Sequence, residues 1–261
     1  MGEEFPALTK AVESAEQGWG ERSAAALVAS LEAVPAGDCD GLARYQGAGE
    51  RLTALLPATK RRLQEAEQVW VERAVAQYEK RSSALPADDW DGYDKIRAEH
   101  ARLVRLAPGA APRLAAAEWA WAGRVVDAAV SDAKPLLDAE PLKASEQLRQ
   151  RAARLDRAGF QALRPDDPPE APDGPPRKVR TKLLDARRDA ARAALTAAQR
   201  QARELIREDR YQAALAVAKT TEERLGPEAR ALKLGDELTR FHDTCAFVAR
   251  LAREAGKEDP K

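Results

Sequence analysis

Apolar positions recur every three or four residues over residues 58–85, and no proline interrupts this segment. The positions on this stripe are Leu63, Ala66, Trp70, Ala74 and Tyr78. This spacing places all five side chains on one face of an α-helix. We therefore predict a long amphipathic helix that ends at Leu85, before Pro86.

A second, shorter stripe follows this break. Its positions are Tyr93, Ile96, His100, Leu103 and Leu106. The carboxylate of Asp88 or Asp89 can cap the second helix by accepting from free amides of its first turn. Pro108 ends the helix, and Pro112 suits the first turn of the next one, where the missing donor costs nothing. Two helices joined by a few residues run antiparallel, so the pair predicts a helical hairpin.

The hairpin pattern repeats with a period of 51 residues. The segment 15–22 recurs as 66–73 with six identical residues in eight. The same shift pairs Pro35 with Pro86, Asp38-Cys39-Asp40-Gly41 with Asp89-Trp90-Asp91-Gly92, and Pro57 with Pro108. A third copy carries Leu114 and Trp121 and, after one inserted residue, Leu148 and Leu155. The repeated units are marked by Trp19, Trp70 and Trp121.

Neither helix of a hairpin can bury its stripe alone, so neighbouring units must stack. We predict an all-α fold in which residues 1–163 form a three-unit array of antiparallel helical hairpins. The helix period fits a solenoid and an elongated bundle equally well. Ala and Leu dominate the apolar residues and favour helices, while clean alternation typical of strands is missing.

The composition changes abruptly over residues 164–176, which read RPDDPPEAPDGPP. Such a segment favours an extended polyproline conformation. We interpret it as a linker behind the array or as a long loop between helices. Residues 177–261 then predict a diverged hairpin, with helices over 179–206 and from Tyr211 to Pro227, followed by a terminal helix over 228–255.

The diverged hairpin carries a short pattern of its own, Asp209-Arg210-Tyr211-Gln212-Ala213-Ala214-Leu215, with Ala218 and Pro227 further on. This pattern resembles the tetratricopeptide repeat, in which a Tyr, a small Ala at the helix crossing and a closing Pro recur. The resemblance covers mainly residues 205–227, and the 51-residue period of the earlier units departs from that family. It implies a solenoid that binds peptides or proteins.

The terminal helix has apolar positions spaced four, three, four, three and four residues apart. They are Leu234, Leu238, Phe241, Cys245, Val248 and Ala252. This heptad spacing is typical of a helix–helix seam. We favour packing on the preceding hairpin because the seam is short for a coiled coil. Self-association through residues 234–252 is the alternative.

Charge is balanced over the chain, with 43 basic and 43 acidic residues. Residues 1–50 hold nine acids and three bases, a net charge of −6. Cys39 and Cys245 fit neither a disulfide framework nor a metal-ligand spacing. The chain shows no signal-peptide or lipidation pattern at its start, and no membrane span of about 18 apolar residues. These features predict a cytoplasmic protein.

Positive charge gathers at residues 177–192. The bases are Arg177, Lys178, Arg180, Lys182, Arg187, Arg188 and Arg192, against Asp185 and Asp189. Cations at the start of a helix oppose its macrodipole, which suggests an acidic partner. That partner could be the acidic first hairpin, a nucleic acid or an anionic lipid. A solvated, Arg-rich helix face is the alternative and the one we favour.

The repeated tryptophans share the stripe of Leu63 and Leu114, so we predict that they are buried where hairpins meet. An aromatic groove for a peptide is the alternative. Trp119 lies two residues from Trp121 and must face elsewhere, and Trp90 belongs to a hairpin tip. Trp90 and Trp119 are therefore candidate partner contacts.

No catalytic or metal-binding arrangement is recognisable. The segment Asp38–Gly41 has its glycine in the fourth position, whereas a calcium-binding EF-hand loop needs glycine in the sixth, so helix capping explains it. We predict that His100 and His242 are packed residues. A nucleophile motif and a phosphate-binding loop are missing, so we predict no enzyme activity and no cofactor.

These features predict a non-catalytic scaffold or adaptor that binds protein partners through a helical-repeat surface. A nucleic-acid or anion-binding module that uses residues 177–192 is the first alternative. A structural subunit or segment of a larger multi-domain protein is the second.

Overall fold

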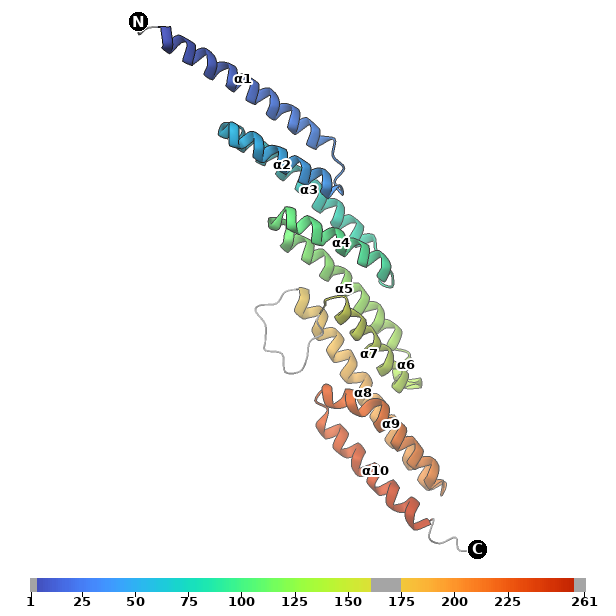
Figure 1. The fold of residues 1–261 in the computed structure, drawn as a ribbon. Coiled ribbons are helices and arrows are strands. Elements are labelled where there is room, and N and C mark those ends of the chain that lie inside the picture. The colour runs from blue at the N-terminus through green and yellow to red at the C-terminus, as the bar shows by residue number, and fades with distance from the viewer. Residues whose placement is uncertain (1–3, 161–174, 256–261) are drawn as a thin grey trace. The chain divides into compact units, whose positions relative to one another are not determined.

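The computed structural model describes residues 4–160 and 175–255, with side chains from residue 8 onward, and these residues form an all-α fold (Figure 1). The described residues contain ten α-helices and two 3-10 helices and no strand. The chain divides into two compact units, Met1–Glu118 and Trp119–Lys261. No helix in the described parts is both long and apolar enough to cross a bilayer.

The first unit contains α1, α2, α3, α4 and the start of α5. The bounds are α1 (Glu4–Glu32), α2 (Cys39–Leu55), η1 (Pro57–Thr59), α3 (Lys60–Ala84), α4 (Trp90–Leu106), η2 (Pro108–Ala110) and α5 (Ala111–Ala133). Helix α2 packs against α1, α3 and α4. Consecutive helices α1 and α2 run antiparallel in Figure 1, as expected for a hairpin.

The starts of α2 and α4 have matching geometry. Asp38 has φ −84° and ψ 80°, and its Oδ1 accepts from the Gly41 amide at 2.9 Å. Asp89 has φ −82° and ψ 78° and accepts from the Gly92 amide at 2.8 Å. Asp89, not Asp88, is therefore the cap of α4. A side chain at Gly41 would meet Val34 at 2.6 Å, so the close approach of the turn requires glycine.

The ends of α2 and α4 also match. Leu56 and Ala107 both have φ −136° and precede Pro57 and Pro108. The extended backbone follows from the clash between a proline ring and a helical residue before it. Each proline then begins a 3-10 helix that leads into the next long helix. The predicted breaks at both prolines are confirmed.

Trp70 and Trp121 are completely buried, which confirms the prediction for these two residues. The Trp70 indole donates from Nε1 to the Val34 carbonyl at 3.1 Å and so connects α3 to the preceding hairpin. The prediction is wrong for Trp19, which is 49% exposed. Helix α1 is the first described helix, and no described segment covers Trp19 as the turn after α1 covers Trp70.

The second unit contains the rest of α5 and five further helices. They are α6 (Leu136–Ala139), α7 (Pro141–Arg157), α8 (Pro175–Arg207), α9 (Tyr211–Ala231) and α10 (Gly235–Ala255). Helix α8 contacts α7, α9 and α10, and Leu184, Leu195, Leu225 and Phe241 are buried among them. Small alanines such as Ala191 and Ala194 let these helices approach closely.

Two predicted boundaries in this unit are wrong. Pro227 lies inside α9 and does not close it, in contrast to the tetratricopeptide-like reading. The helix continues to Ala231, and Lys233 ends it with a φ of 57° while Leu234 donates to the Ala229 carbonyl. Helix α8 begins at Pro175, inside the predicted linker 164–176, because proline is tolerated in a first turn. Residues 164–174 lie outside the described residues.

The apolar heptad positions over residues 234–252 pack inside the second unit. Leu234, Leu238, Phe241, Val248 and Ala252 are buried, and Cys245 is partly buried against the same core. Burial raises the pKa of the Cys245 thiol to about 11. The seam therefore packs on α8 and α9, as the favoured interpretation predicts.

Replacement of Trp70 with Ala should lower the free energy of unfolding by about 3–5 kcal/mol, because it leaves a cavity in the contact between α3 and the preceding hairpin. Urea denaturation followed by circular dichroism measures the change. Trp19→Ala is the matched control at the same repeat position and should cost under about 1 kcal/mol, since this indole is half exposed. Equal losses in the two variants would contradict the assigned packing.

Candidate functional site

The charged cluster predicted at residues 177–192 is largely engaged in contacts within the second unit. Arg187 forms a two-pronged ion pair with Glu228 of α9, with Nε to Oε1 at 2.9 Å and Nη2 to Oε2 at 3.1 Å. The two side chains are only 14% and 6% exposed. A buried, paired guanidinium of this kind connects α8 to α9 and is not available to a partner.

Other bases of the cluster have internal partners as well. Arg192 donates from Nε to Glu237 of α10 at 2.8 Å. The pKa of Glu237 is lowered by a backbone hydrogen bond and by this arginine. Lys182 lies 2.7 Å from Asp127 of α5, and Arg188 lies 3.6 Å from Asp185. These pairs favour the interpretation of the cluster as a helix face with compensated charge.

The predicted aromatic contacts are partly or wholly covered. Trp119 is half-buried, with the Phe160 ring edge-on at 5.0 Å and the Arg180 guanidinium 5.4 Å from its centroid. Trp90 is buried, at 5% exposed, so its assignment as an accessible partner contact is wrong. It is the first residue of α4, and the equivalent residue of α2, Cys39, is buried too. Arg177 and Lys178, in the first turn of α8, are exposed.

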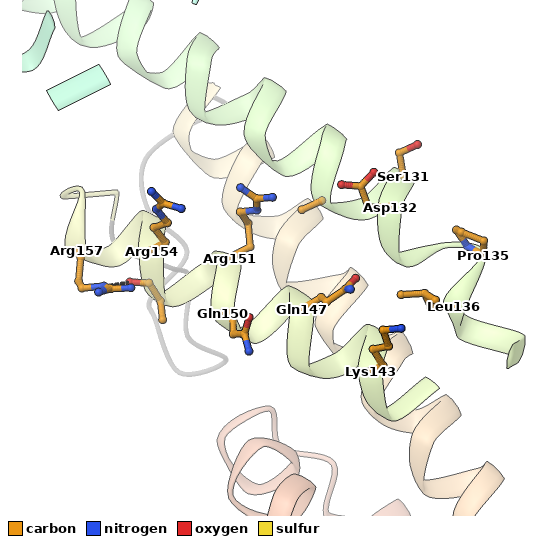
Figure 2. Close-up of a pocket in the computed structure, with 12 residues that line it drawn as sticks. Ser131, Asp132, Pro135, Leu136, Lys143, Gln147, Gln150, Arg151, Arg154 and Arg157 are labelled. Carbon is orange, nitrogen blue, oxygen red and sulfur yellow. Dashed lines mark hydrogen bonds between the residues drawn. The ribbon is translucent and has the colours of Figure 1, made fainter. Parts of the chain in front are cut away.

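The structure contains a groove between α5 and α7 that was not predicted from the sequence (Figure 2). It has a volume of about 950 Å³. Its polar lining consists of Ser131 and Asp132 from α5 and Lys143, Gln147, Gln150, Arg151, Arg154 and Arg157 from α7. Four cations against one carboxylate give the groove a positive field.

The amphipathic sequence of α7 explains the groove. Its apolar face, with Ala144, Leu148, Ala152 and Leu155, is buried, and the basic and amide side chains occupy the other face. Arg157 donates from Nε to the Ala153 carbonyl of its own helix at 3.3 Å. Arg151 is half-buried and makes no ion pair within the described residues. The arrangement can bind carboxylates through arginine forks and amide donors.

A signal for this groove is present in the sequence. Lys143, Gln147, Arg151 and Arg154 are spaced four, four and three residues apart and lie away from Leu148 and Leu155. The denser run at 177–192 drew the prediction instead. Density of charge does not show which charges have partners across the fold.

A buried polar cluster in the first unit is structural. His100 Nδ1 lies 2.5 Å from Glu118 Oε1, and the Tyr78 hydroxyl donates to the same oxygen at 3.2 Å. The Tyr78 and His100 rings meet edge-on at 5.7 Å. The prediction that His100 is packed is confirmed. The cluster connects α3, α4 and α5.

His242 lies differently, since it is exposed and its Nε2 lies 2.8 Å from Glu222. The prediction that it is packed is therefore wrong, because the side chain lies on the outer face of α10. Within the described residues, no three side chains of the metal-binding types come together.

Three buried phenols predict a loss of stability at alkaline pH. Burial and, to a smaller extent, the negative charge of Glu67 raise the pKa of Tyr45 to about 12. Burial and, to a smaller extent, Glu118 raise the pKa of Tyr78 and of Tyr93. A folded-state pKa above the unfolded value of about 10 stabilises the fold fully below pH 10. That contribution is lost as the pH rises above 10. The urea concentration at the midpoint of unfolding should decrease as the pH is raised from 9 to 11.5, and it should decrease less steeply in Tyr78→Phe. An identical dependence on pH in the variant would contradict this account.

Removal of one member of the Arg187–Glu228 pair should cost about 3–5 kcal/mol of unfolding free energy, because the other charge stays buried without compensation. Glu228→Gln and Arg187→Met test this in chemical denaturation. The double variant should lose less than the sum of the two single losses. Additive losses would show that the two side chains do not stabilise each other.

Comparisons of the chain with protein-family models, with curated proteins and with solved structures returned no match.

Proposed function

We propose that this chain is a non-catalytic interaction scaffold and that the groove between α5 and α7 binds an acidic segment of a partner protein. The groove is the observation that carries the proposal. Its basic side chains share one face of α7, and its volume of about 950 Å³ suits an extended peptide. Acidic side chains would meet guanidinium groups, of which that of Arg151 is half-buried, and hydrogen bonds between two charged groups are stronger than those between neutral ones.

The scaffold part of the proposal is a stacked array of helical hairpins. The matching backbone angles at Asp38 and Asp89, and again at Leu56 and Ala107, support a structural repeat of 51 residues. In an array of this kind each unit contacts its neighbours and leaves a long lateral surface for partners. The proposed groove lies on such a surface of the second unit.

Nucleic-acid binding through residues 177–192 is the less favoured proposal. Arg187 and Arg192 bind Glu228 and Glu237, and Lys182 binds Asp127. These contacts leave fewer cations for phosphates than the sequence suggests. Arg177 and Lys178 are the exposed members on which this alternative depends.

A fluorescein-labelled oligoglutamate peptide is the probe for the groove. Its affinity for the full chain, measured by fluorescence anisotropy, should fall about tenfold or more in Arg151→Glu/Arg157→Glu, since each reversal removes an attraction and adds a repulsion. The matched control is Arg149→Glu/Arg203→Glu, at exposed positions outside the groove.

Equal affinity of both double variants for the peptide would refute the groove as the binding site. Labelled duplex DNA forms a second arm of the same experiment. DNA binding that falls steeply with salt and is lost in Arg177→Gln/Lys178→Gln would favour the alternative.

A further inference from the structure

The apolar face of α1 is exposed to an extent that its repeat position does not explain. Leu8, Val12 and Trp19 are 63%, 52% and 49% exposed. The residues 51 positions later, Thr59, Leu63 and Trp70, are 8%, 5% and 0% exposed. The same stripe is therefore covered on η1 and α3 and open on α1.

The open stripe borders a groove between α1 and α2 of about 560 Å³. Its lining includes Trp19, Ser23, Ala26, Leu27, Ser30, Ala48 and Leu52. Six of these residues have counterparts 51 positions later that line the equivalent place between α3 and α4. The counterparts are Ala74, Gln77, Tyr78, Arg81, Glu99 and Leu103. There the remaining cavity is only about 20 Å³.

The turn of the preceding hairpin closes the second groove. Ala36 and Gly37, from the turn between α1 and α2, and Cys39, the first residue of α2, complete its lining. Two polar contacts fix this turn in place. Trp70 Nε1 donates to the Val34 carbonyl, and Arg102 of α4 donates to Asp40 at 2.5 Å.

The open groove keeps the groups that make these contacts. Trp19 occupies the position of Trp70, and Arg51, at the position of Arg102, lines the groove and makes no ion pair within the described residues. Leu55, at the rim, is 69% exposed. The surface therefore offers an indole donor, an arginine and an apolar floor in a known arrangement.

We propose that the groove between α1 and α2 is a docking surface for the interhelical turn of a helical hairpin from another protein. The turn would carry small residues in the place of Ala36 and Gly37 and an aspartate in the place of Asp40. Trp19 would donate to a carbonyl at the end of the partner's first helix, and Arg51 would bind the aspartate.

A second copy of this chain does not fit the description. Its turn at residues 35–39 already fills the groove between α3 and α4. Its exposed turn in the second unit is Arg207-Glu208-Asp209-Arg210, four charged residues that are too large to replace Ala36 and Gly37. Its turn between α3 and α4 ends at Trp90, which is 5% exposed, so this turn is covered within the chain as well. The occupant is therefore a hairpin of different sequence.

The inference extends the scaffold proposal to a second surface, and its test involves no residue of the α5–α7 groove. An added hairpin, a copy of residues 9–59 joined ahead of residue 9 of the full chain, serves as a tethered occupant at high local concentration. The added copy carries Trp19→Phe, so that acrylamide quenching reports the original Trp19. We expect at least a threefold lower quenching constant for the Trp19 component and a blue shift of its emission.

Two matched variants separate specific docking from a general effect of the added segment. Ala36→Trp in the added turn should restore quenching of Trp19, because the bulky turn cannot enter the groove. Arg51→Asp in the original chain should restore it as well, and Asp40→Arg in the added copy should then bring protection back. Unchanged quenching of Trp19 in the extended chain, or protection that both single variants leave intact, would overturn the proposal.

The origin of the occupant is tested in the intact chain. A photo-crosslinking benzoylphenylalanine at position 19, activated in the cells that produce the protein, should yield a cross-link to the turn of a helical hairpin in a different protein. Cross-links confined to this chain or to a second copy of it would overturn the assignment of the occupant.

Discussion

The insertion of the turn between α1 and α2 into the groove between α3 and α4 is the contact on which the first unit depends. Helices of this length cannot bury an apolar stripe alone, and a hairpin covers only part of it. Ala36 and Gly37 are small enough to enter the groove between α3 and α4, and Asp38 fixes the turn by capping α2. The completely buried Trp70 then hydrogen-bonds to the end of the inserted segment. Each part of the sequence motif thus has a steric or hydrogen-bonding reason.

Electrostatics plays two different roles in the second unit. The arginines of α8 that point toward α9 and α10 meet buried or half-buried carboxylates and hold the helices together. The arginines Arg151, Arg154 and Arg157 of α7 line an open groove whose lining includes one carboxylate, that of Asp132. Net charge near zero over the whole chain conceals this division. A binding surface is therefore identified by where carboxylates are missing, and less by where bases are concentrated.

Local sequence patterns predicted most of the helix boundaries. Pro57, Pro108 and the capping aspartates act within a few residues, so their effects can be read from the chain directly. The end of α9 could not be predicted, because Lys233 adopts a left-handed conformation that lysine rarely takes. The period also shows which face of a helix is apolar but not what covers that face. For this reason Trp19 was predicted to be buried but is half exposed, and Trp90 was named a candidate partner contact but is buried.

The candidate sites depend on pairing over long sequence distances. The partner of Arg187 is 41 residues away, and the partner of Arg192 is 45 residues away. Spacing within a helix contains no information about these contacts. The polar face of α7 could in principle be predicted from the sequence. The open groove beside it could not, because it depends on how α5 and α7 pack.

The position of Cys39 gives the fold a chemical reporter. This thiol is 8% exposed at the inserted turn, and burial raises its pKa, so both shielding and protonation suppress its reaction with alkylating reagents. It becomes reactive when the turn leaves the groove. The rate of its modification under native conditions therefore measures the free energy of opening of this one joint, separately from global unfolding.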